Sequence, residues 1–384
     1  MKSNLFLGAL LVATAFTLGS CNSSGNEDVP DAVQKTAQVQ LTLKGTVGTR
    51  ATGTQIPTQS DENTIIRYTV VIFNSDANTS VNAIRTFEGS NTMPTLSCTP
   101  AQNCTGIVVA NAPSDNYFAG VSNKADFLAR TITLADAQTS TNLPMSGQIL
   151  LSSSGTFTLS AGNNTGLIVS LSRLVARVSI SSIKTDFNTN GQYANASFKP
   201  TNIFIRNAQS VVVPNTGDVI TTTPSSVAFL KGNYSGFTSG KSFLTGDVSG
   251  AAEMSGTSIP YTTNFWFYLF PNASSSNRTA LVIEGTFKAN SSDAGTTVYY
   301  PIIINKTQLN TTIQEGDGTT MTTVDGSTNP RLGSIDRNKC YALMATIRTI
   351  GITDPDGTID PASLSITVSV ASWALTVSQD VVFE

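Results

Sequence analysis

Residues 364–377 read LSITVSVASWALTV, two short alternating segments in direct succession with no charged side chain. An apolar residue at every second position is typical of a strand that buries one face. The stretch therefore predicts two consecutive strands. Their apolar positions are Leu364, Ile366, Val368 and Val370 and, after the phase reverses at Ala371-Ser372, Trp373, Leu375 and Val377.

Short runs of the same kind recur through the rest of the chain. Near the front, Val39, Leu41 and Leu43 alternate with polar residues. Only 122–130 and 134–139 resemble short helices, and Gly/Ser/Thr-rich loops separate the runs, notably over 308–330. Many short strands with turn signals between them predict an all-β fold of sandwich domains. The other predicted strands are 65–73, 106–110, 157–159, 166–171, 174–183, 198–206, 211–213, 264–270, 280–287, 298–304 and 340–350.

Composition excludes several classes of function. Charged residues make up 12% of the chain, the net charge is −3, and there is no histidine. Without a basic stripe the chain is not expected to bind nucleic acid. Without histidine, Ser-His-Asp and Cys-His catalysis and histidine-based zinc sites are excluded. Paired carboxylates far apart in sequence stay open, but we expect no enzyme, no cofactor and no metal.

The N-terminus predicts export as a lipoprotein. Lys2 precedes a short apolar run over 5–18, which ends in Leu18-Gly-Ser-Cys21. Small residues directly before a cysteine are the pattern of a lipoprotein signal, so we expect residues 1–20 to be removed and Cys21 to carry lipid. An ordinary secretory signal with a chance cysteine is the alternative. Residues 21–50 then form a lipidated propeptide.

Because export is expected, we interpret the remaining cysteines as those of a protein in an oxidising compartment. Cys98 and Cys104 flank a short loop and are a possible disulfide. Cys340 is left over in a strand-like stretch, and we expect it to be a buried thiol.

Two further features concern processing and domain organisation. Arg50 stands alone among small, flexible residues, so an Arg-specific, trypsin-like protease could cut between Arg50 and Ala51. A chance arginine in a loop is the alternative. The polar stretch 185–195 predicts a domain boundary, with one β-sandwich over 51–186 and a second over 187–384.

Six motifs, in order, resemble those of the FimA-like fimbrillins, the major subunits of the type V pili of Bacteroidales. No single motif is decisive, and their order and spacing carry the resemblance along essentially the whole chain. They are GIVVAN at 106–111, LPMSG at 143–147, LSRLVARVSI at 171–180, VYYPII at 298–303, IDRNKCY at 335–341 and ASW at 371–373.

The resemblance implies two transthyretin-like β-sandwich domains and a route of assembly. The lipoprotein precursor reaches the outer membrane, and a surface protease cuts after Arg50. The strand over 37–47, with Val39, Leu41 and Leu43, then leaves a groove that the C-terminal strands of another copy fill. The implied partners are other copies, accessory pilins and the protease.

We expect a stalk subunit that supports adhesion in a surface fimbrium. An accessory or tip pilin is the alternative within the family. Outside it, the alternative is a monomeric outer-membrane lipoprotein that binds glycans, although Trp266 and Trp373 lie in strand patterns rather than in loops.

Overall fold

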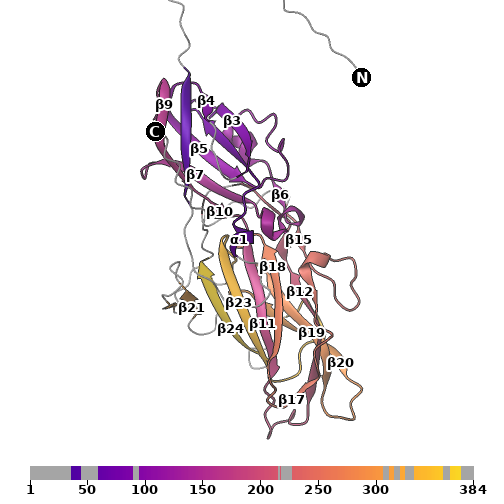
Figure 1. Ribbon diagram of the computed structural model, residues 1–384. Coiled ribbons are helices and arrows are strands. Elements are labelled where there is room, and N and C mark those ends of the chain that lie inside the picture. The colour runs from indigo at the N-terminus through magenta and orange to yellow at the C-terminus, as the bar shows by residue number, and fades with distance from the viewer. Residues whose placement is uncertain are drawn as a thin grey trace, which may run out of the picture. The chain divides into compact units, whose positions relative to one another are not determined.

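The computed structural model describes residues 36–44, 59–89, 95–214, 217, 227–305, 311–314, 321–324, 333–357 and 364–372 (Figure 1). The fold is all-β, as the sequence predicts. Its helices are short: α1 (Gln59–Glu62), α2 (Lys124–Leu128) and the 3₁₀ turns η1 (Ala135–Ala137), η2 (Ser140–Asn142) and η3 (Ser242–Leu244). Within the described part of the chain, no helix is long and apolar enough to cross a membrane.

The first sheet has nine strands, in the order β3-β2-β5-β7-β9-β1-β4, with β8 on β5 and β10 on β7. Most neighbours are antiparallel, but β1 runs parallel to β9. The strands are β1 (Ala37–Lys44), β2 (Arg67–Phe73), β3 (Val81–Glu88), β4 (Leu96–Cys98), β5 (Ala101–Ala110), β7 (Met145–Leu151), β8 (Phe157–Leu159), β9 (Gly162–Ser170) and β10 (Ser172–Arg173).

Strand β2 is buried on both faces, which explains its nearly continuous apolar sequence. Val70 and Ile72 belong to the core that β1 also enters, whereas Val71 and Phe73 face a second cluster beneath α2. Asn123 begins α2 as its N-cap, accepting a hydrogen bond from the amide of Asp126 at 2.9 Å.

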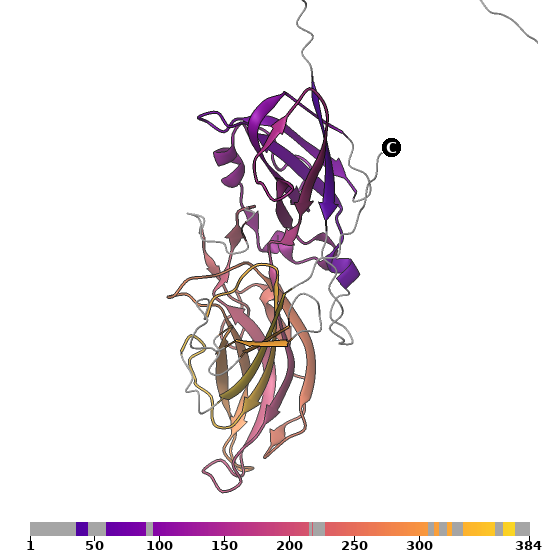
Figure 2. The ribbon, with the colours of Figure 1, turned by 90° about the vertical axis from the view of Figure 1, so that its left-hand side faces the viewer.

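Two more sheets enclose the largest core. One has the order β18-β11-β23-β24-β21-β22, and the other has the order β16-β12-β19-β20, with β17 on β12. Figure 2 shows both from the side. The strands are β11 (Ala176–Thr185), β12 (Ser197–Arg206), β16 (Thr245–Asp247), β17 (Met254–Ser255), β18 (Tyr261–Leu269), β19 (Ala280–Lys288), β20 (Thr296–Ile303), β21 (Thr311–Gln314), β22 (Met321–Val324), β23 (Lys339–Ile347) and β24 (Leu364–Ser372).

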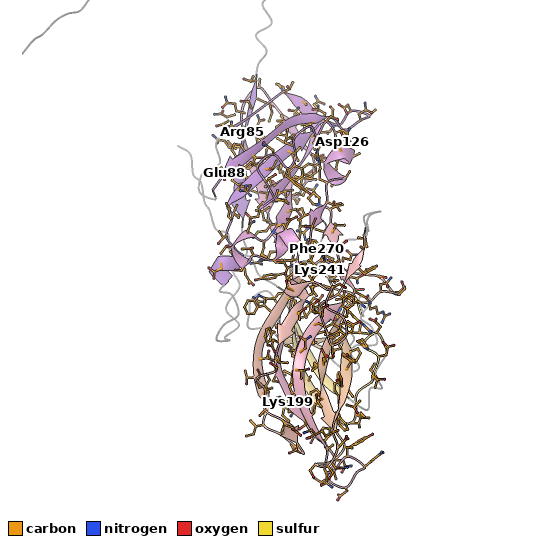
Figure 3. The ribbon with its side chains drawn as sticks, turned by 90° about the vertical axis from the view of Figure 1, so that its right-hand side faces the viewer. Arg85, Glu88, Asp126, Lys199, Lys241 and Phe270 are labelled. Carbon is orange, nitrogen blue, oxygen red and sulfur yellow. The ribbon has the colours of Figure 1, made fainter. Side chains whose placement is uncertain are left out.

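Two small strand pairs complete the structure. β6 (Ile132–Thr133) pairs with β14 (Val211–Val212), and β13 (Ala208–Gln209) pairs with β15 (Phe229–Leu230). The charged side chains labelled in Figure 3, among them Arg85 and Asp126, are exposed, whereas Phe270 is buried. The charged side chains labelled there thus lie on the outside, whereas a few others, among them Glu62 and Arg173, are buried.

The structure departs from the predicted organisation at two places. β11 precedes the boundary predicted after residue 186, yet it pairs with β18 and β23, so strand pairing assigns it to the second group of sheets. The loop predicted over 308–330 is wrong in part, because β21 and β22 form an antiparallel hairpin there. Their Thr-rich sequences carry no alternation that would have revealed them.

Candidate functional site

Strand β1 occupies a slot inside the first sheet. It pairs in parallel with β9, from Ala37 opposite Gly162 to Lys44 opposite Ser170. On its other side it pairs with β4 over three residues only, from Ala37 opposite Cys98 to Val39 opposite Leu96. Figure 1 shows β1 in indigo beside β9. The first three residues of β1 are therefore paired through the main chain with a strand on each side, β9 and β4.

One face of β1 is part of the core. The exposed fractions of Ala37, Val39 and Leu41 are 0%, 0% and 3%, whereas Gln38 and Gln40 on the other face are half-buried. The alternation read from the sequence is confirmed for Val39 and Leu41; the side chain of Leu43 lies outside the described part. Burying an aliphatic side chain contributes about 1.5–3 kcal/mol, so Val39 and Leu41 together contribute about 3–6 kcal/mol as an upper bound.

Two thiols lie in the core that β1 covers. Cys98 and Cys104 are both buried and both free in this structure. Burial, assisted by the neighbouring Cys104, raises the pKa of Cys98 to about 12, and burial also raises the pKa of Cys104. Their bridging stays a prediction.

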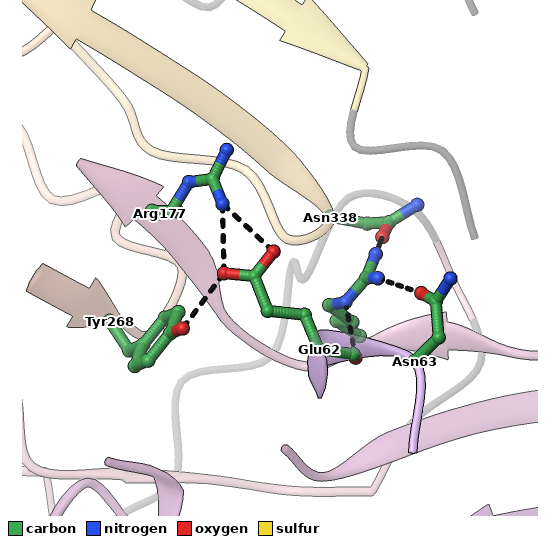
Figure 4. A network of polar contacts seen from close by, with 6 residues as sticks. Glu62, Asn63, Arg177, Tyr268 and Asn338 are labelled. Carbon is green, nitrogen blue, oxygen red and sulfur yellow. Dashed lines mark hydrogen bonds and ion pairs between the residues drawn. The ribbon is translucent and has the colours of Figure 1, made fainter. Parts of the chain in front are cut away.

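A buried polar network is centred on helix α1 (Figure 4). Glu62 is 1% exposed, and Nη1 of Arg177 donates to both its carboxylate oxygens at 2.8 Å. The hydroxyl of Tyr268 donates to Oε1 of Glu62, also at 2.8 Å. Burial, followed by the adjacent Glu62 carboxylate, raises the pKa of Tyr268. The network thus joins α1 to β11 and β18.

Arg173, fully buried, extends the network. Its Nε donates to the main-chain oxygen of Glu62 at 3.1 Å, and its guanidinium also donates to the amide oxygens of Asn63 and Asn338. Burial lowers its pKa to about 10, against the attraction of Glu62, so it remains charged at neutral pH. The carboxylate of Glu62 therefore lies among cations in a low-dielectric setting.

Arg337 and Asn111 bring two further motifs, GIVVAN at 106–111 and LPMSG at 143–147, to the same place. Arg337 donates to the main-chain oxygens of Arg173 at 2.9 Å and Ser146 at 3.2 Å. Asn111, with φ +56°, donates to the oxygens of Thr64 at 2.7 Å and Leu143 at 3.0 Å. Four of the six family motifs thus contact one another. Sequence reasoning found the motifs but not Glu62, whose partners lie 115 and 206 residues away.

The other predicted site residues fall into two groups. Leu364, Ile366, Val368 and Val370 lie on β24, which pairs with β23 along all nine of its residues, so their segment is part of the chain's own sheet. Their role as donors stays a prediction. The residues that lie outside the described part are Cys21, Arg50, Ala51, Trp373, Leu375 and Val377.

The described residues of the site offer hydrogen bonding and packing. Among the described residues, no three His, Cys, Asp or Glu side chains gather as metal ligands do. The turn Asp354–Gly357 is held by two contacts: Asp356 lies 3.6 Å from Lys231, and the main-chain oxygen of Pro355 accepts a hydrogen bond from Arg206 at 2.6 Å. β1 is thus one strand inside a larger sheet, and residues 45–58 are its covalent link to α1.

One protein-family model matches part of the chain. The model of the major fimbrial subunit protein family (FimA) matches residues 37–173, the region from β1 to β10. No curated protein sequence matches the chain.

Several solved structures share the fold. A fimbrilin from Porphyromonas gingivalis superposes with a TM-score of 0.61 at 18% identity, over 89% of this chain and 99% of that one. A candidate cell adhesion protein from Parabacteroides distasonis gives 0.60 at 20% identity, over 90% and 98%. One from Bacteroides eggerthii gives 0.55 at 21% identity, over 91% and 99%. The resemblance to the FimA-like fimbrillins is thereby confirmed, by the family model over residues 37–173 and by the fold over most of the chain.

Proposed function

We propose that this chain is a structural subunit, and not an enzyme, of a cell-surface pilus. β1 would be a removable strand whose place is taken by a strand of a second copy. The observation that carries the proposal is the position of β1, inserted between β9 and β4 with its apolar face in the core.

The proposed route of maturation follows from the order of features along the chain. Lipid on Cys21 holds the precursor at the outer membrane. An Arg-specific surface protease then cuts between Arg50 and Ala51, within the segment that joins β1 to α1. β1 leaves with the lipidated propeptide, whereas α1 stays bound through Glu62.

An emptied slot would favour strand addition. Its edges, β9 and β4, would present unpaired N–H and C=O groups above an uncovered apolar core. A strand from another copy satisfies the hydrogen bonds and covers the core together. Because a head-to-tail contact of this kind does not close on itself, it propagates a filament.

The donor is proposed to come from the C-terminal strands, which alternate and carry no charge over 364–377. A subunit that both accepts and donates a strand suits the stalk, with accessory pilins as further partners in a fimbrium that supports adhesion. Until it is cut, the precursor fills its own slot and stays unassembled.

Replacing Arg50 with Ala tests the proposal. Cells carrying Arg50→Ala should retain the full lipoprotein and show no fibres by electron microscopy, because β1 cannot leave. The protein sheared from wild-type cells should begin at Ala51. Arg85→Ala is the matched control, since Arg85 is an exposed arginine on the edge strand β3. Normal fibres on cells that carry Arg50→Ala would refute the route.

A further inference from the structure

Strand β4 is the less secure of the two strands beside β1. It has three residues, Leu96–Cys98, and among the described residues β1 is the one strand that pairs with it. β9, on the other side of β1, also pairs with β7. When β1 is absent, β9 therefore remains in a sheet, whereas β4 loses the strand that pairs with it.

A side-chain amide contacts the end of β4 from the opposite end of the same sheet. β3 and β4 stand first and last in the sheet order, yet they contact each other. Oδ1 of Asn82, on β3, accepts a hydrogen bond from the main-chain N–H of Thr99 at 3.0 Å, and Nδ2 of Asn82 donates to the main-chain oxygen of Thr99 at 3.0 Å. Opposite residues of antiparallel strands exchange the same pair of bonds. The amide of Asn82 thus takes the place of a neighbouring strand directly after β4.

The amide of Asn82 is itself held by the hairpin of β2 and β3. Its Nδ2 also donates to Oδ1 of Asn74 at 2.7 Å, and Nδ2 of Asn74 donates to the hydroxyl of Ser80 at 3.0 Å. From the same hairpin, the hydroxyl of Ser75 donates to the main-chain oxygen of Gln102 at 3.1 Å. The connection from β4 to β5 is therefore tied at two points to a hairpin that pairs with β5.

The core contacts of β4 do not define its register. Leu96 and Cys98 are buried in the core that β1 covers, and Ser97 between them is exposed. Apolar contacts are non-directional, so they leave a segment of three residues free to slide once β1 has gone. The two hydrogen bonds of Asn82 are directional and hold Thr99, the residue directly after β4. They therefore fix the position of β4 along the sheet.

We propose that Asn82 is a positioning residue for strand exchange, which keeps β4 in register while β1 is absent. The proposal rests on the proposed function and concerns the interval between the departure of β1 and the arrival of the next strand. In the precursor, β1 and Asn82 hold β4 together. In the emptied subunit Asn82 alone presents β4 to an incoming strand, so that both edges of the slot are formed before binding. Without Asn82, β4 must be ordered during binding, which lowers the affinity.

The test measures how tightly the emptied slot binds a strand. Full-length precursor is cut with an arginine-specific endoprotease, and the fragment that ends at Arg50 is removed by gel filtration. The probe is a fluorescent synthetic peptide of residues 37–47, which carries the sequence of β1 itself. Fluorescence anisotropy should show that Asn82→Ala binds this peptide at least about ten-fold more weakly than the wild type, because ordering the backbone of one residue already costs that much.

A second measurement separates positioning from a general structural role. In the uncut precursor, hydrogen exchange at the amides of Leu96–Cys98 and the temperature of unfolding should stay close to the wild-type values in Asn82→Ala, because β1 still pairs with β4. After the cut and the removal of β1, the same amides should exchange at least about ten-fold faster in the variant than in the wild type. A residue that only supported the fold would change both states alike.

Three further variants serve as controls. Asn78→Ala, which removes an exposed asparagine from the turn of the same hairpin, should bind the peptide as the wild type does. Asn82→Asp keeps the size of the side chain but lacks the donor for the oxygen of Thr99, so it should weaken peptide binding as Asn82→Ala does. Ser75→Ala removes one bond farther from β4 and should weaken binding by a smaller factor.

The outcomes distinguish this proposal from the proposed function. Equal affinity of the wild type and Asn82→Ala for the peptide would overturn the role of Asn82 while leaving strand exchange intact. Faster exchange at Leu96–Cys98 by the same factor in the uncut and the emptied variant would overturn it as well. If wild-type protein cut after Arg50 neither releases β1 nor binds the peptide, the proposed function itself fails, and this proposal fails with it.

Discussion

The carboxylate of Glu62 is buried, and charged and hydroxyl groups donate hydrogen bonds to it. Arg177 and Tyr268 both reach it at 2.8 Å, and Arg173 holds its main-chain oxygen at 3.1 Å. A buried ion pair of this kind contributes little net stability, but removing one partner leaves the other charge uncompensated. Through this carboxylate, α1 is joined to β11 and β18.

Replacing Glu62 with Ala should therefore destabilise the protein strongly. We expect a loss of about 3–5 kcal/mol in the free energy of unfolding, because Arg177 and Tyr268 lose a buried acceptor. The measurement is denaturant unfolding of the uncut precursor.

Glu253→Ala is the matched control for this substitution. Glu253 pairs with Lys288 at 3.1 Å, and both side chains are partly exposed, so its loss should cost about 0–1 kcal/mol. Similar losses for Glu62→Ala and Glu253→Ala would show that the network does not hold α1.

Strand β1 is the element on which the accessibility of the Cys98 thiol depends. Putting a carboxylate at Leu41, which is 3% exposed, should loosen β1, because an unpaired charge in a core is very costly. In the uncut precursor with Leu41→Asp, the pKa of Cys98 should fall from about 12 towards its ordinary value as burial is lost. Alkylation of Cys98 at pH 8 should then accelerate at least about ten-fold, because the thiolate is the reactive form.

Gln40→Asp is the control on the same strand. Gln40 is half-buried on the opposite face, so a carboxylate there stays in contact with water. The alkylation rate, read by mass spectrometry of the peptide that contains Cys98, should stay near the wild-type rate. Equal rates for the two variants would mean that β1 does not shield the thiol.

Strands with clear alternation were predictable from the sequence, and strand neighbours were not. Apolar spacing predicted β8 and β19 nearly to the residue, and it predicted the core-facing residues of β1. It missed β3, whose burial is uneven, and the hairpin of β21 and β22. Pairing depends on residues far apart in the chain, so no local pattern indicated that β11 pairs with β23 or that β24 pairs within the chain's own sheet.

The same distinction applies to the site. The slot residues Val39 and Leu41 followed from periodicity, and the arginines appeared as parts of motifs. Glu62 lies in a polar stretch with no pattern, and only the fold brings it to Arg177. A buried carboxylate whose partners are remote in sequence leaves no local signal.

Across the whole molecule, one continuous segment joins the slot to the strand that holds the C-terminal region. β9 lines the slot, leads through β10 into β11, and β11 pairs in parallel with β23. β23 in turn pairs with β24. Arg173 and Arg177 lie on this segment and are held by Glu62 and Arg337. If subunits are joined by strand exchange, tension along a fibre is transmitted through each subunit by residues 162–185.

The titratable groups of the whole chain also set where its stability depends on pH. Burial raises the pKa of Tyr68 to about 12, and it raises the pKa of Tyr117 and of Tyr299 to the same value. Burial likewise raises the pKa of Cys98 to about 12. In the unfolded chain, the pKa of a thiol is about 8.5 and that of a phenol is about 10. With no histidine in the sequence, no side chain of that type titrates near neutral pH.

Stability should therefore be nearly constant from pH 6 to 8 and fall as the pH rises from 9 to 12. Between the unfolded and the folded pKa values the folded chain binds more protons than the unfolded one, so raising the pH favours unfolding. Guanidinium midpoints of the uncut precursor measured at pH 6, 8, 10 and 11 check this. Tyr68→Phe should flatten the alkaline decline, because it removes one phenol that ionises only on unfolding. The buried phenols and thiols do not lose protons between pH 6 and 8. If the guanidinium midpoint fell as steeply between pH 6 and 8 as between pH 9 and 11, other groups would control the stability.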